Sequence, residues 1–347
     1  MNLKDFRMPA EWEEHSKTWL SWPHQEADWP GKFEPVPWVF AEIARLITAS
    51  EKLGLIVKDA AAKKQATDYL KRTNVDLNKV EFHIEPTDRG WMRDCGAIFI
   101  KNKFGDLAAL DFEFNAWAKY PNYKSDNKLA TAIAKSQKAK LVKPMHKNKP
   151  VVLEGGAIDV SGAGDLITTE ECLLSKRQCR NPGFTKEDYE AVFKEYLGVE
   201  NTIWLGNGIQ GDDTHGHVDD LARFVNKHTI VTVVESNRKS SNYDALKDNL
   251  KRLKKAEDKR GRKFEVVELP MPKPVIFDGE VLPASYANFL ITNKSVLVPI
   301  FNDAEDKNAL SILGMCFPKH EVVGIYSRDL VWGLGTIHCL TQQVPSF

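Results

Sequence analysis

Short apolar runs recur along the chain at a nearly constant spacing. The runs AIFI, AIDV, ARFV and FLIT begin at Ala97, Ala157, Ala222 and Phe289, so successive starts lie 60, 65 and 67 residues apart. Each run is followed by polar or glycine-containing turn residues and then by a second apolar run, which is the pattern of a β-hairpin. The spacing therefore predicts a hairpin unit that is repeated along the chain.

A segment of helical character follows each hairpin and leads into a further strand. The expected helices span residues 125–139, 186–196, 243–256 and 304–315, with a fifth at 37–50. Five strand–helix–strand units of similar length fit either a closed ring of repeats or an ordinary layered α/β domain. In a ring, the polar residues that precede the inner strand of each unit would converge on one centre.

The composition narrows the class of protein. The chain has 347 residues, of which 42% are hydrophobic, and 48 Lys and Arg balance 48 Asp and Glu. This balance gives no basic excess of the kind that nucleic-acid-binding proteins show. The basic run between Lys247 and Lys263 overlies leucines at helical spacing, which predicts a solvated helix face. No nucleic-acid partner is therefore expected.

The sequence also predicts a cytoplasmic location. No apolar run approaches the ~18 residues of a membrane helix, and the N-terminal segment lacks the features of a signal peptide. The five cysteines are odd in number and include no Cys-x-x-Cys pair. Such cysteines are typical of free thiols in a reducing compartment and do not favour a disulfide framework or a zinc–thiolate site.

The segment GDDTHGHVDD, residues 211–220, precedes the ARFV run and carries most of the candidate chemistry. If the segment is extended, His215, His217 and Asp219 lie on one face. Two histidines and a carboxylate form a known metal-ligand set. The same residues could instead perform acid–base chemistry, with His217 carrying the proton and Asp219 binding a substrate. A turn capped by its own polar side chains is the third interpretation.

Cys339 is the candidate nucleophile among the cysteines. It lies in GLGTIHCLTQQ, a glycine-rich and polar segment whose composition is that of an exposed loop, whereas Cys172 and Cys316 border apolar runs. Reactive cysteines need a surrounding that stabilises the thiolate. Trp91 could be a core residue or the flat wall of a cation site. Glu154 precedes Gly155 and could cap a turn or face a ligand.

These segments together resemble the agmatine deiminase family, within the guanidino-group-modifying enzymes related to bacterial peptidylarginine deiminase. The similar stretches are WMRDCG at 91–96, FNAW at 114–117, EGG at 154–156, GDDTHGHVDD at 211–220 and GLGTIHCLTQQ at 333–343. The resemblance covers nearly the whole chain. It implies an α/β fold, a five-bladed α/β propeller of ββαβ units with pseudo-fivefold symmetry, formed by residues 1–347 as a single catalytic deiminase domain.

The resemblance also implies roles for individual residues. Cys339 is expected to be the nucleophile and His217 the general acid and base. Asp94 and Asp219 are expected to hold the guanidinium nitrogens, and Glu154 to lie beside the guanidinium or to orient His217. Carboxylates suit this task because charge-assisted, bidentate hydrogen bonds fix the plane of a guanidinium.

The expected reaction is hydrolysis of the guanidinium group of agmatine to N-carbamoylputrescine and ammonia, in putrescine biosynthesis, without a metal or organic cofactor. Trp91 and Asp213 are expected to line the channel for the substrate's chain and its far ammonium. An arginine or peptidylarginine deiminase with the same mechanism, or a metallohydrolase that uses His215, His217 and Asp219, is the alternative. Relatives are often dimers, which makes a homodimer an expectation, and no segment suggests a membrane partner.

Overall fold

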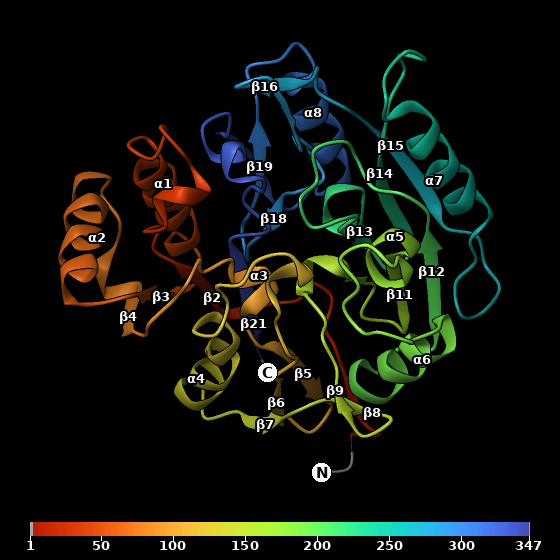
Figure 1. The fold of residues 1–347 in the computed structure, drawn as a ribbon, viewed down its shortest axis with the longest axis horizontal. Coiled ribbons are helices and arrows are strands. Elements are labelled where there is room, and N and C mark those ends of the chain that lie inside the picture. The colour runs from red at the N-terminus through yellow and green to blue at the C-terminus, as the bar shows by residue number, and fades with distance from the viewer. Residues whose placement is uncertain (1–2, 347) are drawn as a thin grey trace.

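The strands of the protein are grouped into five sheets of three or four strands and two short hairpins (Figure 1). A computed structural model describes residues 3–346 of the chain. All five sheets share one internal order: an antiparallel pair comes first, and a helix then crosses to a parallel third strand. The alternation of apolar runs seen in the sequence therefore corresponds to one repeated ββαβ unit.

The five units have the following elements, in the order first strand, second strand, helix and third strand. They are β5 (Ile98–Asn102), β6 (Leu107–Leu110), α4 (Leu129–Ser136) and β7 (Lys140–Val142); β10 (Asp159–Val160), β11 (Asp165–Thr169), α6 (Lys186–Val192) and β12 (Asn201–Leu205); β13 (Ala222–Asn226), β14 (Thr229–Val234), α7 (Tyr243–Lys255) and β15 (Glu265–Pro270); β18 (Leu290–Ile291), β19 (Ser295–Ile300), α8 (Asp306–Cys316) and β20 (Glu321–Tyr326); and β21 (Thr341–Pro345), β2 (His15–Ser21), α1 (Val36–Thr48) and β3 (Lys52–Val57).

The fifth unit joins the two ends of the described chain. Strand β21, close to the C-terminus, pairs antiparallel with β2, close to the N-terminus. Helix α2 (Ala60–Arg72) and strand β4 (Val80–Ile84) extend this sheet, and β1 (Phe6–Arg7) pairs with β5 of the next unit. In Figure 1 the units follow one another around the molecule in the order of the sequence.

The five predicted helices are confirmed with small changes in their bounds. Thr185 begins α6 with a capping box, and a π-helical turn at Phe193–Leu197 follows α6 and ends at Gly198, which has a φ of 69°. Helix α2 was not predicted, because its buried face consists of the small residues Ala62 and Ala66 with only Leu70 as a strongly apolar member. Its first turn is capped by Asp59, which accepts a hydrogen bond from the Ala62 amide at 2.7 Å.

The AIDV run forms a shorter strand than the sequence predicts. Gly155–Ala157 adopt a 3₁₀ turn, in which the Ala157 amide donates to the Glu154 carbonyl at 3.1 Å, so the strand begins at Asp159. The remaining short elements were also unpredicted. They are α3 (Met92–Cys95), α5 (Glu170–Leu174), β8 (Met145–His146), β9 (Lys149–Pro150), β16 (Val275–Phe277) and β17 (Glu280–Leu282), together with β1, β4 and β21.

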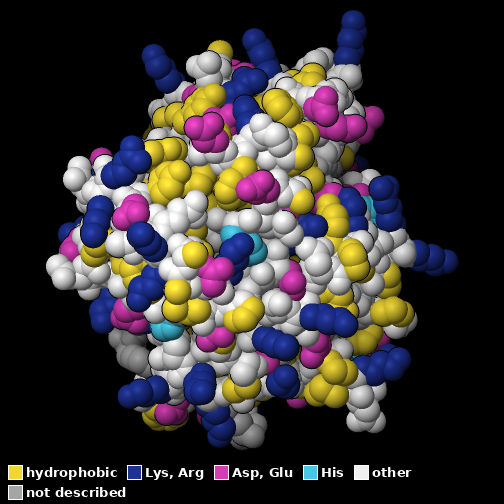
Figure 2. All heavy atoms as spheres, turned by 60° about the vertical axis from the view of Figure 1, so that its left-hand side comes forward, with side chains coloured by type: hydrophobic (Ala, Val, Ile, Leu, Met, Phe, Trp, Pro, Cys, Tyr) yellow, Lys and Arg dark blue, Asp and Glu magenta, His cyan; other side chains and the backbone are white. Residues whose placement is uncertain are grey.

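The sheets and helices enclose three clusters of buried apolar side chains. On the face shown in Figure 2, acidic and basic side chains are intermingled, in keeping with the equal numbers of the two in the sequence. Within residues 3–346, no helix has the length and apolar character that crossing a membrane requires. The five cysteines are all free thiols.

Candidate active site

Candidate functional side chains from four of the five units converge at one place, and each lies just before the first strand of its unit. Asp94 is in α3, before β5, and Glu154 precedes the turn that leads to β10. His217 and Asp219 lie in and beside the 3₁₀ turn Val218–Asp220, before β13. Cys339 precedes β21. The shared position in the unit explains how residues so distant in sequence meet.

His217 lies at the centre of three carboxylates. Its Nδ1 is 3.8 Å from Asp94 Oδ1 and 4.0 Å from Asp219 Oδ1, and its Nε2 is 3.7 Å from Glu154 Oε2. These distances are those of ion pairs and exceed the range of hydrogen bonds. The four side chains are almost completely buried.

Gly156 allows this close approach. A Cβ atom at this position would lie 2.5 Å from His217 Nδ1 and 2.9 Å from Asp94 Oδ1. The Gly156 amide instead donates to Asp94 Oδ1 at 3.1 Å, while the Trp117 indole donates to Asp94 Oδ2 at 2.9 Å. The EGG motif thus carries backbone into the site at a point where a side chain would collide with the histidine.

The Cys339 thiol is held by a residue that the sequence analysis missed. Asn288 Nδ2 donates to the sulfur at 3.0 Å, and Asn288 Oδ1 accepts from Thr336 Oγ1 at 2.7 Å. The sulfur also lies 3.6 Å from Asp219 Oδ2. The expectation of an exposed loop was wrong, because the Cys339 side chain is buried and its residue is only 5% exposed. It does, however, line a cavity.

His338 and Arg180 each bind one oxygen of a carboxylate in the site. His338 Nδ1 lies 2.7 Å from Asp219 Oδ2, and its Nε2 lies 2.8 Å from Glu11 Oε2. Arg180 Nε donates to Glu154 Oε1 at 3.0 Å. Such partners orient the functional oxygens without occupying all of them.

Charge in the site is distributed unevenly. Burial raises the pKa of Asp94 to about 6, although His217 opposes the shift. Burial would also raise the pKa of Glu154, but Arg180 and His217 lower it to about 2. Burial would lower the pKa of His217, but Asp94, together with Cys172 and Glu154, holds it well above its usual value. The imidazole is therefore a cation among anions at neutral pH.

The Cys339 thiol lies in a surrounding that disfavours its charged form. Burial, followed by the negative charges of Asp219, Asp220 and Asp94, raises the pKa of Cys339 well above its usual value. A thiol in this surrounding becomes a thiolate readily only when further positive charge enters the site. The arrangement thus suits a cationic substrate that would activate its own nucleophile.

A cavity of about 100 Å³ leads from Cys339 and Asp94 toward the surface, and the predicted channel residues Trp91 and Asp213 line it. Trp91 stacks on Trp29, with ring centroids 5.6 Å apart, and its indole donates to Asp28 Oδ2 at 3.1 Å. Asp213 is paired with the ammonium of Lys119 and accepts a hydrogen bond from Tyr120 at 2.7 Å. The cavity therefore has an aromatic wall and an acidic outer end.

The predicted His–His–Asp face does not form. His215 has a φ of 66° and Gly216 a φ of 95°, and these left-handed residues break the alternation of an extended segment. The His215 ring therefore points to Ser175 Oγ, at 3.0 Å, and to Glu171. Among the described residues, the group of side chains that could hold a metal ion is Glu154, Cys172 and His217, so the proposed metallohydrolase ligand set was wrong.

Sequence reasoning missed Asn288 and Cys172, although a signal existed for the first. Asn288 immediately precedes the FLIT run, which is the same place in its unit that Asp94 and Glu154 occupy in theirs. Cys172 was taken for a core residue because it borders Leu173 and Leu174, and its side chain is indeed fully buried. Only the fold shows that its sulfur reaches His217.

Comparisons with known proteins show which family the chain resembles. A family model described as Porphyromonas-type peptidyl-arginine deiminase matches residues 7–345. The agmatine deiminase of Pseudomonas aeruginosa (strain LESB58) is 34% identical over 364 residues, which cover 98% of this chain and 96% of that protein.

Solved structures are similar over the same extent. The agmatine deiminase of Enterococcus faecalis superposes with a TM-score of 0.90 at 32% identity, covering 99% of this chain and 96% of that one. A cysteine-to-serine variant of the C. jejuni agmatine deiminase with substrate bound gives a TM-score of 0.85 at 32% identity, covering 97% and 96% of the two chains. The protein thus has an α/β fold that matches these deiminase structures.

Proposed function

The chain belongs to the Porphyromonas-type peptidyl-arginine deiminase family, and from this premise we propose that it hydrolyses agmatine to N-carbamoylputrescine and ammonia through a covalent intermediate on Cys339. One observation carries the proposal. Four buried polar atoms around the thiol have no hydrogen-bond partner within the described residues: Glu154 Oε2, Asp219 Oδ1 and both ring nitrogens of His217. A planar guanidinium supplies donors to acidic oxygens of this kind, and charge to the site.

The proposed reaction begins with a guanidinium held by Asp94 and Asp219. Its charge offsets the acids that disfavour the thiolate, so the Cys339 thiol gives up its proton to solvent as the substrate binds. The sulfur then adds to the guanidinium carbon. His217 gives a proton to the departing nitrogen, ammonia leaves, and an amidino group remains bonded to the sulfur. His217 then takes a proton from water, which attacks the carbon and releases the urea-type product. Asn288 holds the Cys339 sulfur in position during the reaction.

The choice of agmatine over arginine rests on charge at the far end of the cavity. Agmatine ends in an ammonium, which suits the acidic Asp213. A free-arginine enzyme needs a cation for the substrate's carboxylate. Arg93 and Arg180 are both buried and engaged, Arg93 by Gln343 and Glu11 and Arg180 by Glu154. Arg89 lines the cavity, but its guanidinium is paired with Asp28. The curated and solved relatives named above are agmatine deiminases, which supports the same choice.

The test is product analysis by mass spectrometry. Purified enzyme is incubated with agmatine, arginine and a blocked arginine peptide, with a chelator in every tube, beside Cys339→Ala and the control Cys179→Ala. We expect a product about one mass unit heavier from agmatine alone, absent with Cys339→Ala and retained with Cys179→Ala. Conversion of arginine or the peptide instead would overturn the substrate, and activity in Cys339→Ala would overturn the mechanism.

We propose further that the five ββαβ units form a five-bladed propeller with pseudo-fivefold symmetry, acting as a single catalytic domain over residues 1–347. The common order of strands in the five sheets and the pairing of β21 with β2 support a closed ring. A cytoplasmic location is proposed on the five free cysteines, since free thiols persist in reducing compartments. Fractionation of cells expressing the protein, followed by activity measurements, tests that location.

A further inference from the structure

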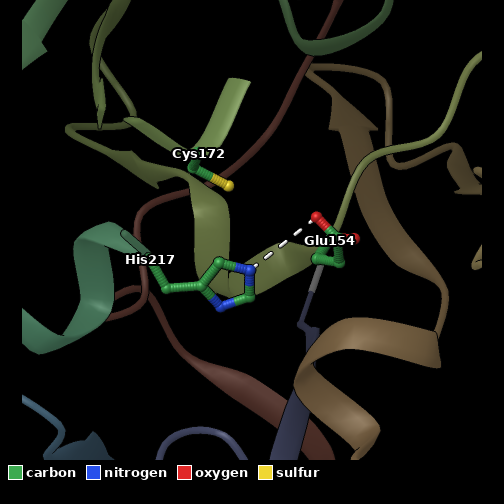
Figure 3. A group of neighbouring side chains, drawn as sticks. All are labelled: Glu154, Cys172 and His217. Carbon is green, nitrogen blue, oxygen red and sulfur yellow. Dashed lines mark ion pairs between the residues drawn. The ribbon is translucent and has the colours of Figure 1, made fainter. Parts of the chain in front are cut away.

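Cys172 is a second thiol in contact with the machinery of the site. It lies in α5, whose first turn is capped by Thr169: Thr169 Oγ1 accepts from the Cys172 amide at 3.1 Å and donates to the Gly216 carbonyl at 2.5 Å. This bond ties the start of α5 to the residue before His217. In Figure 3 the side chains of Cys172, His217 and Glu154 point toward one another from three separate segments.

The spacing of Glu154 and His217 suits a shared metal ion better than it suits a direct hydrogen bond. Ligand atoms of Glu154, Cys172 and His217 all lie within 4.8 Å of one another. The gap of 3.7 Å between His217 Nε2 and Glu154 Oε2 is too long for a hydrogen bond. It is close to the ~3.4 Å that separates two ligands placed about 2.1 Å from a tetrahedral zinc ion.

Both of these atoms are deeply buried and have no hydrogen-bond partner among the described residues. The Glu154 side chain is oriented by Arg180, which binds Oε1 and leaves Oε2 facing the histidine and the thiol. Partners of this kind, which hold a ligand's other atom, are a regular feature of metal sites. The positive charge of Arg180 weakens the attraction for a cation, whereas a carboxylate and a thiolate together supply two negative charges.

We propose that Cys172, His217 and Glu154 form a binding site for a thiophilic divalent cation such as Zn²⁺, and that the bound ion inhibits the enzyme. Thiolate, imidazole and carboxylate are the ligands that zinc takes in proteins, whereas Mg²⁺ and Ca²⁺ require oxygen ligands. An ion on Nε2 displaces the proton that the His217 imidazolium carries there, so the histidine can no longer give a proton to the departing nitrogen or take one from water. The inhibition rests on the proposed hydrolysis, but the binding of the ion does not.

Cobalt provides a readout that is independent of turnover. A thiolate bound to Co²⁺ gives a charge-transfer band in the near ultraviolet, and Co²⁺ accepts the ligands and geometry of zinc. Chelator-stripped enzyme is titrated with Co²⁺ as the wild type, Cys172→Ala, Cys172→Ser, Cys339→Ala and the control Cys179→Ala. We expect the band at one ion per chain in the wild type, Cys339→Ala and Cys179→Ala, and its loss in both Cys172 variants.

Two results would overturn the site. If the band is lost in Cys339→Ala and kept in the Cys172 variants, the ion is bound by the nucleophile. If no variant gives the band, no thiolate site exists. Cys172→Ser guards against misfolding, because it is nearly isosteric and its fold is checked by circular dichroism.

The inhibition is measured separately, on agmatine hydrolysis relative to the metal-free rate of each variant. We expect Zn²⁺ to inhibit the wild type and Cys179→Ala, with reversal by chelator, and the half-inhibiting concentration to rise at least tenfold in Cys172→Ser. Cobalt binding without zinc inhibition would overturn the inhibitory role alone. Cobalt binding by a protein that hydrolyses no agmatine would contradict the proposed function and leave the site intact.

Discussion

The ionisation of Asp94 is expected to set the acid limb of the pH dependence of kcat/KM for agmatine. Burial raises its pKa to about 6, and the hydrogen bond from Trp117 opposes that rise. Guanidinium binding needs the ionised carboxyl, so kcat/KM for agmatine should fall as the pH drops through about 6, since this ratio reports groups in the free enzyme. Trp117→Phe removes the stabilising donor and should move the fall to a higher pH.

The measurement is kcat/KM for agmatine from pH 4.5 to 8.5, in about half-unit steps, for wild type and Trp117→Phe. Trp204→Phe is the matched control, because its indole donates to Glu190 in another unit, away from the site. An acid limb that stays in place, or moves to lower pH, in Trp117→Phe would show that Asp94 does not control it.

Cys339 should react with charged reagents in preference to neutral ones. Burial, together with the surrounding carboxylates, raises its pKa well above the usual value, so the free enzyme holds mainly the thiol. An alkylating amidine brings a positive charge beside Asp94 and Asp219, which favours the thiolate as it binds. We expect it to inactivate the enzyme at least about tenfold faster than the neutral amide with the same leaving group, a difference of ~1.4 kcal/mol.

The two inactivation rates are followed as loss of agmatine hydrolysis, and the labelled residue is located by peptide mass spectrometry. Saturating agmatine should protect the enzyme against both reagents. Equal rates for the amidine and the amide would mean that the acids around the thiol do not govern its reactivity.

Lys119 should compete with the substrate for Asp213. Its ammonium is paired with that carboxylate at the outer end of the cavity, and its side chain is 41% exposed. In Lys119→Met the substrate's own ammonium should bind Asp213 more readily. We expect KM for agmatine to fall by about two- to fivefold with kcat unchanged, the size of effect that an exposed ion pair of ~1 kcal/mol or less allows.

Steady-state kinetics with agmatine test this, with Lys147→Met as control, since Lys147 forms a comparable surface pair with Asp188 outside the site. A rise in KM for Lys119→Met would show instead that the lysine helps to hold the substrate.

At the scale of elements, the turn at Gly155–Ala157 determines the position of the histidine. Gly156→Ala would place a Cβ atom 2.5 Å from His217 Nδ1, and either the turn or the imidazole must shift. A displacement of ~1 Å in a catalytic group can cost about a hundredfold in rate, and we expect kcat/KM to fall by about that factor. Steady-state kinetics measure the fall in kcat/KM, and thermal unfolding measures whether the shifted turn also lowers the stability of the protein.

Gly314→Ala is the matched control for this substitution. Gly314 lies within α8, and a Cβ atom there would meet nothing within 4 Å. Alanine should stabilise this helix by about 0.5–1 kcal/mol and leave hydrolysis unchanged. An active Gly156→Ala would mean that the histidine tolerates displacement and that the EGG motif serves the turn alone.

Elements could be predicted from the sequence wherever a strong apolar period marked them. Helix α7, with leucines at helical spacing, was placed to within one residue of its end. Helix α2 was missed because alanine gives little contrast between its faces. The path of GDDTHGHVDD could not be predicted, because left-handed backbone at His215 is determined by its surroundings and not by a residue preference.

At the scale of the molecule, the repeat in the sequence predicted the order of elements within each unit and, for a closed ring only, the convergence of polar residues. Asp94, Glu154, His217 and Cys339 do meet at one site from separate units. The pairing of β21 with β2 had no signal in the sequence, since β21 itself was not predicted as a strand. Contacts between units, such as Cys172 with His217, depend on how the units pack and therefore emerge only from the fold.

Glu11 links the N-terminal segment to three other parts of the molecule. Its Oε2 lies 2.5 Å from Arg223 and 2.8 Å from His338, and its Oε1 accepts from the Ile291 amide at 2.8 Å. Arg223 is fully buried and has no contact with solvent. Arg223 is also paired with the buried Asp159, so the loss of the Glu11 charge should cost less than the ~3–5 kcal/mol typical of a buried charge left without any partner.

Glu11→Gln should therefore lower the free energy of unfolding by about 1.5–3 kcal/mol, the size expected for lost hydrogen bonds to charged groups, measured by urea denaturation. It should also reduce kcat, because His338 loses a charged partner and positions Asp219 less well. Glu42→Gln is the control: its pair with Arg45 is exposed on α1, so its loss should cost less than ~1 kcal/mol. If both variants unfold at the same urea concentration, Glu11 does not hold the units together, and its burial reflects packing of the N-terminal segment alone.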